Sequence, residues 1–225
     1  MASRTPPERQ HLLQLMTLMT GDEKHSDSAT STLEVIWTLY DRIMRVDPRN
    51  PLDPERDRFL LSKGHGPMAY YAVLAAKGFI PVEWLSGFGG YESPLGWHPD
   101  RNLIPGVEIA SGSLGHGLPL AVGMASALRS RSSEALVVCL VGDGELDEGS
   151  NHEAIAMAGR LGLGALTAVV IDNRSDSYGW PGSIAGRFEL EDWSSAVVNG
   201  RDPEAIANGF GTDHPSRPHV VVAEV

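Results

Sequence analysis

The chain has 225 residues, 42% of them hydrophobic, which is enough for a substantial buried core and excludes global disorder. The 29 acidic residues outnumber the 18 basic ones and no long Lys/Arg run occurs, which argues against nucleic acid as a partner. One cysteine excludes a disulfide framework and a thiolate metal cluster. The sequence also has neither a signal-peptide pattern nor an apolar run that could span a membrane, so we expect a cytoplasmic protein.

The first half of the chain predicts three helices, one short strand and one long loop. Apolar residues recur at helical spacing in the three helical segments, whereas the Gly- and Pro-rich loop shows little periodicity. A loop of that length inside a compact domain is typical of a binding site. The predicted ranges are 12–19, 30–45 and 68–77 for the helices, 59–61 for the strand and 87–117 for the loop, with a surface connection at 47–57.

The second half alternates apolar, β-prone runs with helical segments. The strands are predicted at 135–141, 166–171 and 219–225, and the helices at 118–129, 149–161 and 203–210. This alternation predicts one α/β domain over residues 1–225, with a helical segment at its N-terminus and a doubly wound, mainly parallel sheet flanked by helices.

Polar residues follow two of the predicted strands. A Gly-Asp-Gly run with further acidic residues occupies 142–149, and Asp172 and Asn173 follow the next strand, with Asn173 lying 30 residues after Asp143. Ligands of parallel α/β sheets bind at the carboxyl ends of the strands, where these residues are expected to meet. A carboxylate, a carboxamide and a loop carbonyl suit Mg²⁺, and the helix that starts near Gly149 could attract an anion such as a diphosphate. The alternative is that Gly-Asp-Gly forms a plain turn and Asn173 a local cap.

These motifs resemble those of the thiamine diphosphate enzymes, and most closely those of the transketolases. The Gly142-Asp143-Gly144 run and Asn173 match the ends of the family's diphosphate motif. Three further segments resemble family loops in the same order along the chain. They are Leu61-Ser62-Lys63-Gly64-His65-Gly66, Gly96-Trp97-His98-Pro99 and Ser111-Gly112-Ser113-Leu114-Gly115-His116-Gly117.

The resemblance implies a role for each matching residue. The side chains of Asp143 and Asn173 and the main-chain carbonyl of Ser175 would bind Mg²⁺, or another divalent cation such as Ca²⁺ or Mn²⁺. His25, His65 and His98 would be catalytic residues that act on substrate protons, a role suited to imidazole near neutral pH. The expected thiamine diphosphate contacts are His65, Gly112, Ser113, Leu114, Gly142, Asp143, Gly144, Glu148 and Asn173.

Two differences from the family's usual pattern bear on these expectations. His25 matches a catalytic histidine, but Lys24 and Ser26–Ser28 replace its glycine-rich neighbours. The pyrimidine-binding domain, which supplies the glutamate that activates the cofactor, is not represented in the 225 residues. The resemblance therefore implies the N-terminal subunit of a two-component transketolase, paired with a C-terminal subunit, in an α2β2 assembly acting on sugars or sugar phosphates. A Gly-rich, aromatic segment contains Trp84, Phe88, Tyr91 and Trp97, which could belong to that interface or equally to the core.

Two other functions remain open from the sequence. An α-type subunit of a 2-oxoacid dehydrogenase-like system also carries Gly-Asp-Gly and Asn, and would pass a two-carbon unit to a lipoyl or acyl-carrier partner. The loops around His65 and His98 favour transketolase over this function. A non-catalytic scaffold subunit is the third possibility, and the retention of Asp143 and Asn173 argues against it.

Overall fold

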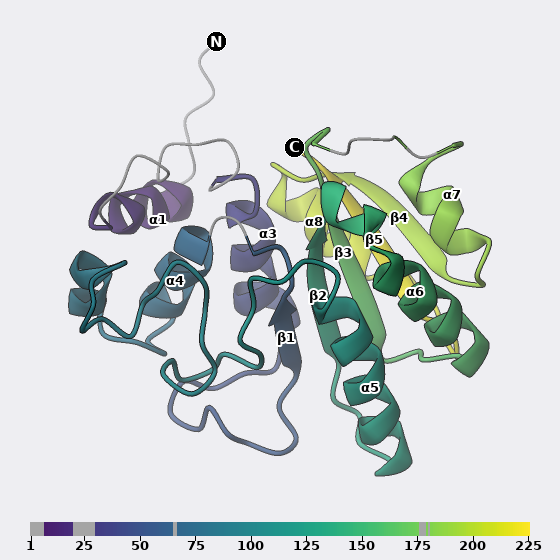
Figure 1. Cartoon of the computed structure of the whole chain (residues 1–225), viewed down its shortest axis with the longest axis horizontal. Helices are drawn as coiled ribbons and strands as arrows, with labels where there is room; N and C mark the ends of the chain where they lie inside the picture. Colours follow the sequence, from purple (N-terminus) through teal and green to yellow (C-terminus); the bar gives the residue numbers. More distant parts are fainter. Residues whose placement is uncertain (1–6, 20–29, 65–66, 176–178, 180) are drawn as a thin grey trace.

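The computed structural model describes residues 7–19, 30–64, 67–175, 179 and 181–225 (Figure 1). Five parallel strands form one sheet in the order β1-β2-β3-β5-β4. The strands are β1 (Arg58–Leu61), β2 (Val137–Gly142), β3 (Leu166–Asp172), β4 (Ser194–Asn199) and β5 (His219–Glu224). The expected α/β fold with a mainly parallel sheet is therefore confirmed.

Helices cover both faces of this sheet (Figure 1). One face carries α1 (Pro7–Thr17), α3 (Leu33–Thr38), the π-helical turn η2 (Leu39–Ile43), α4 (Pro67–Ala76) and α8 (Pro203–Phe210). The other face carries α5 (Gly117–Ser130), α6 (Gly149–Leu161) and α7 (Ile184–Glu189). Two short 3₁₀ helices, η3 (Val82–Gly87) and η4 (Gly144–Asp147), complete the fold.

The central strands are apolar throughout because both of their faces are buried. Along β2, Val138 and Leu140 pack into the core on the α4 side, whereas Cys139 and Val141 pack into the core on the α5 side. Successive strand residues point to opposite faces, so a strand covered on both sides needs a continuous apolar run. This pattern made β2 and β3 predictable from the sequence.

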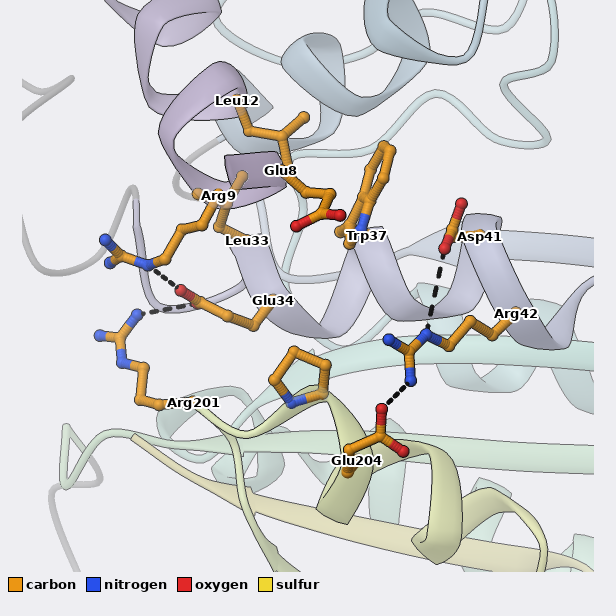
Figure 2. Close-up of a pocket in the computed structure, with 11 residues that line it drawn as sticks. Glu8, Arg9, Leu12, Leu33, Glu34, Trp37, Asp41, Arg42, Arg201 and Glu204 are labelled. Atoms are coloured by element: carbon orange, nitrogen blue, oxygen red, sulfur yellow. Dashed lines mark hydrogen bonds and ion pairs between the residues drawn. The ribbon is translucent and has the colours of Figure 1, made fainter. Parts of the chain in front are cut away.

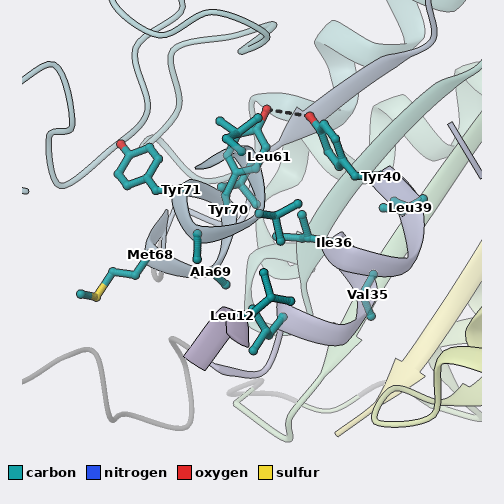
Figure 3. Packing of buried hydrophobic residues seen from close by; sticks show 14 of the residues in the cluster. Leu12, Val35, Ile36, Leu39, Tyr40, Leu61, Met68, Ala69, Tyr70 and Tyr71 are labelled. Carbon is teal, nitrogen blue, oxygen red and sulfur yellow. Dashed lines mark hydrogen bonds between the residues drawn. The ribbon is translucent and has the colours of Figure 1, made fainter. Parts of the chain in front are cut away.

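The core on the α4 side is rich in aromatic residues (Figure 3). The hydroxyl groups of Tyr40 and Tyr70 lie 3.0 Å apart and form a hydrogen bond inside this core. Burial is the main cause that raises the pKa of both phenols, so both stay neutral.

The helix predicted at 30–45 does not stay α-helical to its end. The amide of Met44 donates to the carbonyl of Leu39, which widens the last turn into π-helical form.

Two elements of the fold, β4 and α7, carry no recognisable pattern in the sequence. β4 is one of the two edge strands of the sheet, its residues are half-buried or exposed, and Val197 is 55% exposed. An edge strand of this kind lacks the continuous apolar run that marks the central strands. α7 has only six residues, too few for helical periodicity to be recognised.

A groove of about 290 Å³ lies between α1, α3 and α8 (Figure 2). The carboxylate of Glu34, 5% exposed, binds the guanidinium groups of Arg9 and Arg201 there. These ion pairs join the N-terminal helix to the segment that precedes α8. Glu34 in α3 thus links α1 to the segment between β4 and α8.

Within the described part of the chain, the structure contains no helix with the length and apolar character needed to cross a bilayer.

Candidate functional site

The polar residues singled out from the sequence meet at the carboxyl ends of three neighbouring strands. In the sheet, Leu61 of β1 pairs with Leu140 of β2, and Gly142 of β2 pairs with Ile171 of β3. The strands β1, β2 and β3 are neighbours and end at the same side of the sheet. The residues that follow them, Ser62, Asp143 and Asn173, therefore lie at the carboxyl ends of adjacent strands. This is the place where parallel α/β sheets bind their ligands.

Asp143 is fully buried and holds the loop after β3 against the end of β2. Its Oδ2 accepts a hydrogen bond from the amide of Ser175 at 2.7 Å. Its Oδ1 accepts from the hydroxyl of Ser175 at 2.5 Å and from the amide of Gly144 at 2.8 Å. Asp143 and Ser175, two of the three residues expected to hold the metal, are thus in contact through the amide and the hydroxyl of Ser175.

Asn173 supplies a buried oxygen without a protein partner. Its Oδ1 is inaccessible to solvent, and no hydrogen bond reaches it within the part of the chain described here. A buried carbonyl oxygen left in this state is costly unless a ligand satisfies it. The main-chain carbonyl oxygen of Ser175 lies beside Gly144, at 3.2 Å from the position that a Cβ on Gly144 would take.

These oxygen donors fit a small, hard cation. Among the described residues, no group of three or more His, Cys, Asp and Glu side chains forms a metal site. A site at Asp143 would instead combine one carboxylate with an amide oxygen and a main-chain carbonyl, which suits Mg²⁺ better than a transition metal.

The surroundings of Asp143 leave room for an anion. α6 begins at Gly149 as expected, so the amide groups of its first turn and its positive dipole end lie next to the Gly-Asp-Gly run. A Cβ on Gly149 would meet nothing within 4 Å. Lys63 lies beneath the run, and its Cε is 3.4 Å from the position of a Cβ on Gly142.

His98 connects two of the loops that resembled family motifs. The carbonyl of Gly64 can only accept a hydrogen bond, so Nδ1 of His98 donates to it, at 3.1 Å, and Nε2 of the neutral ring keeps its lone pair. Gly112 packs against the same ring with a φ of +134°, and a Cβ there would lie 3.0 Å from ring carbons. The loops that contain Gly64, His98 and Gly112 therefore meet, and glycine is required at position 112.

The other expected site residues differ in exposure. Leu114 is half-buried, whereas Ser113 and Glu148 are exposed. The candidate interface aromatics divide between core and surface: Phe88 is buried and Trp84 half-buried, but Trp97 is 51% and Tyr91 99% exposed. His25 and His65 lie outside the described residues, so their catalytic roles stay predictions.

Two charged residues near the site were not recognised from the sequence. Glu145 is 3% exposed, and burial raises its pKa against the opposing effect of hydrogen bonds from Ser62, Gly115 and Gly142. Lys63 is 6% exposed, and burial lowers its pKa against the opposing charges of Asp143 and Glu145. The local sequence of Glu145 and Lys63 does not mark them as buried, since charged residues in polar, glycine-rich loops are normally exposed.

Fold and site together define an α/β domain with a candidate ligand site at the carboxyl ends of its parallel strands. Residues 9–223 match the family model described as "Transketolase, thiamine diphosphate binding domain". The chain belongs to the transketolase family and corresponds to this domain.

Relatives with curated names support this membership. The chain is 36% identical over 206 residues to a subunit of the apulose-4-phosphate transketolase of Actinobacillus succinogenes, covering 88% of this chain and 75% of the relative. It is 37% identical to the 6-deoxy-6-sulfo-D-fructose transketolase subunit SqwG of a Clostridium species, covering 82% and 69%. Both names describe transketolase subunits.

A third relative, from Rhodococcoides fascians, is 57% identical over 212 residues, covering 94% of this chain and 70% of the relative, and is named a ferredoxin. The present sequence has a single cysteine, Cys139, which lies buried in β2. Iron–sulfur clusters of ferredoxins are held by four thiolates, so the matched region of this chain does not provide that ligand set.

Solved transketolases share the fold. A Pichia stipitis transketolase superimposes with a TM-score of 0.84 at 23% identity, covering 98% of this chain and 36% of that one. The Leishmania mexicana enzyme gives 0.80 at 26% identity, covering 94% and 36%. The chain thus spans about a third of the length of these solved transketolases.

Proposed function

We propose that the chain is a subunit of a thiamine diphosphate- and Mg²⁺-dependent transketolase that moves a two-carbon ketol unit from a ketose donor to an aldehyde acceptor. The observation that carries this proposal is the meeting of Asp143, Asn173 and Ser175 at the carboxyl ends of β2 and β3. Their oxygens suit the cation that would neutralise a diphosphate in an otherwise acidic protein.

Each part of the site has its own task in this proposal. Asp143, Asn173 and the Ser175 carbonyl hold the cation, and the first turn of α6 with Gly142 and Gly144 receives the diphosphate. Gly112, Ser113 and Leu114 line the ring end of the cofactor, and Glu148 lies at the rim of the site, facing the partner. Thiamine diphosphate, when bound, supplies the group that accepts the two-carbon fragment, so this chain binds and orients.

His98 is the described candidate for contact with substrate. Its Nδ1 is fixed by the Gly64 carbonyl, which leaves Nε2 to accept a proton or hydrogen bond from a hydroxyl of the sugar. We expect His65 and His25 to assist it, in keeping with their matches to family motifs.

A partner protein is part of the proposal. Two relatives are named as transketolase subunits, and this chain covers about a third of the solved transketolases. The partner would be a C-terminal subunit with the pyrimidine-binding domain and the activating glutamate, in an α2β2 assembly. The exposed side chains of Tyr91 and Trp97 offer apolar surface for such a contact.

The decisive experiment reconstitutes the chain with a pyrimidine-domain transketolase subunit, sought first among the neighbouring open reading frames. Mass spectrometry would follow a panel of ketose donors and aldehyde acceptors with Mg²⁺ and thiamine diphosphate. Transfer by the pair and not by either protein alone supports the proposal. Efficient transfer by this chain alone contradicts the need for a partner. Transfer only to a lipoyl or acyl-carrier protein would replace the transketolase function by the 2-oxoacid dehydrogenase-like one.

A further inference from the structure

Glu145 is the buried carboxylate at the centre of the loops that surround the candidate site. It lies in η4, directly after the Gly-Asp-Gly run, and its side chain turns back beneath that run. Oε2 accepts a hydrogen bond from the amide of Gly142 at 3.3 Å. The side-chain amide of Asn151 donates to the main-chain carbonyl of Glu145 at 2.7 Å, which fixes the backbone of Glu145 against α6.

The second oxygen of Glu145 binds two loops that are distant in sequence. Oε1 accepts from the amide of Gly115 at 2.9 Å and from the hydroxyl of Ser62. Ser62 follows β1, and Gly115 belongs to the segment 111–117, which we call the cofactor loop. The hydroxyl of Ser62 also accepts from the amide of Gly117 at 2.9 Å, so the cofactor loop is held at two points.

The cofactor loop packs tightly against the residues at the start of α6, Glu148 and Ser150. Gly115 has a φ of +80°, and a Cβ there would lie 2.6 Å from the Cβ of Glu148. The hydroxyl of Ser150 donates to the carbonyl of Gly115 at 2.7 Å. The contact between Gly115 and Glu148 therefore leaves no room for a larger residue at position 115. The hydrogen bonds of Glu145 to Gly115 and Gly142 set the distance between the cofactor loop and the Gly-Asp-Gly run.

A carboxylate is the side chain that these donors require. Two amide N–H groups and one hydroxyl converge on two oxygens that only accept. A glutamine of the same shape would present an NH₂ group to at least one N–H donor, and would leave a buried donor unsatisfied. The lysine beside the site, Lys63, provides a nearby compensating charge.

We propose that Glu145 is a positioning residue, which fixes the cofactor loop and the segment after β1 against the Gly-Asp-Gly run. This proposal rests on the proposed function, in which the cofactor loop would hold the ring end of thiamine diphosphate and the Gly-Asp-Gly run its diphosphate end. Glu145 is 3% exposed and would act without contacting the cofactor itself. It acts through Gly115, Ser62 and Gly142, whose preorganisation lowers the entropy lost on binding.

The first test is hydrogen exchange in the 225-residue chain, compared between the wild type, Glu145→Gln and Ser62→Ala. Glu83→Gln, on the exposed surface of η3, is the matched control. We expect the amides of 111–117 to exchange about tenfold faster or more in Glu145→Gln, with a smaller increase in Ser62→Ala, while those of β5 stay protected. Unchanged exchange in the cofactor loop, or an equal increase over the whole sheet, would overturn the positioning role.

The second test is the affinity for thiamine diphosphate in the presence of Mg²⁺, in the assembly that binds it. Glu145→Gln should raise the Kd about tenfold or more, and the double variant with Ser62→Ala should be little worse, because both act on one linkage. A Kd equal to that of the wild type, with only a lower melting temperature, would contradict the proposal. If the wild-type assembly binds no thiamine diphosphate, the proposed function fails, and hydrogen exchange still decides whether Glu145 holds the loops.

Discussion

The carboxylate of Asp143 accepts hydrogen bonds from both the amide and the hydroxyl of Ser175, at 2.7 and 2.5 Å. Through this contact the loop after β3 is held against the end of β2. Two residues before Ser175, the buried amide oxygen of Asn173 has no protein partner among the described residues. In the proposed site, a divalent cation would satisfy these oxygen donors.

The roles of these two residues can be separated by substitution. Asp143→Asn removes a charged ligand and should weaken Mg²⁺-dependent binding of thiamine diphosphate by more than about a hundredfold. Ser175→Ala keeps the main-chain carbonyl, so the affinity should change by no more than about threefold. Calorimetric titration measures both values, with Asp213→Asn on the exposed surface as the control. Equal losses in the two variants would mean that the carbonyl of Ser175 is not the group that matters.

Glu34 should contribute to stability because its buried carboxylate binds two arginines (Figure 2). The guanidinium groups of Arg9 and Arg201 are partly exposed and can return to water, so Glu34→Gln should lower the free energy of unfolding by about 1–2 kcal/mol. Glu204 is exposed and pairs with the exposed Arg42, so Glu204→Gln should have a clearly smaller effect on the free energy of unfolding. Urea denaturation compares the two, and a larger loss from Glu204→Gln would contradict this ranking.

His219 should make the fold sensitive to mild acid. Its side chain is buried at the start of β5, where Nε2 donates to the carbonyl of Gly209 at 3.0 Å and Nδ1 lies 2.6 Å from the hydroxyl of Ser194. Burial lowers its pKa, with a smaller effect of the stacked His214 in the same direction. The unfolded chain takes up a proton near pH 6.5 that the folded chain resists, so the free energy of unfolding falls as the pH drops below about 6.5.

The variant His219→Phe isolates this contribution. It should be less stable than the wild type at pH 7.5, and the gap between the two should narrow towards pH 5.5, because the variant lacks the titrating group. His116→Gln, in an exposed position, should keep the pH profile of the wild type. A gap between wild type and His219→Phe that is constant over this range would show that His219 does not cause the acid sensitivity.

Cys139 should be unreactive in the folded chain. The thiol is fully buried in β2, and burial raises its pKa well above the ordinary value, which removes the reactive thiolate. Labelling with a thiol reagent at pH 8 should therefore be slow in buffer and fast in concentrated urea. Rapid labelling under native conditions would mean that β2 opens locally.

The sequence predicted the parts of the fold that repeat one physical pattern. β2, β3 and β5 are apolar because they are covered on both faces, and α6 and α8 begin and end at the expected residues. β4 could not be predicted, because this edge strand begins with Ser194 and Ser195 and lacks the continuous apolar run of a strand covered on both faces.

Some residues of the candidate site could also be placed from the sequence, and others could not. Asp143 and Asn173 could be placed together because each follows a buried strand, and parallel strands end at the same edge of the sheet. Glu145 could not be interpreted from local sequence, since its hydrogen-bond partner Ser62 lies 83 residues away. Its role follows from the tertiary contact and from nothing within its own segment.

Calorimetric titration with thiamine diphosphate, in the presence and absence of Mg²⁺, tests the proposed metal-dependent cofactor site most directly. The sample is the chain together with its pyrimidine-domain partner. We predict saturable binding with Mg²⁺ and its loss when the metal is chelated by EDTA. Binding that is unchanged after removal of the metal, or no binding in either condition, would contradict the proposed site.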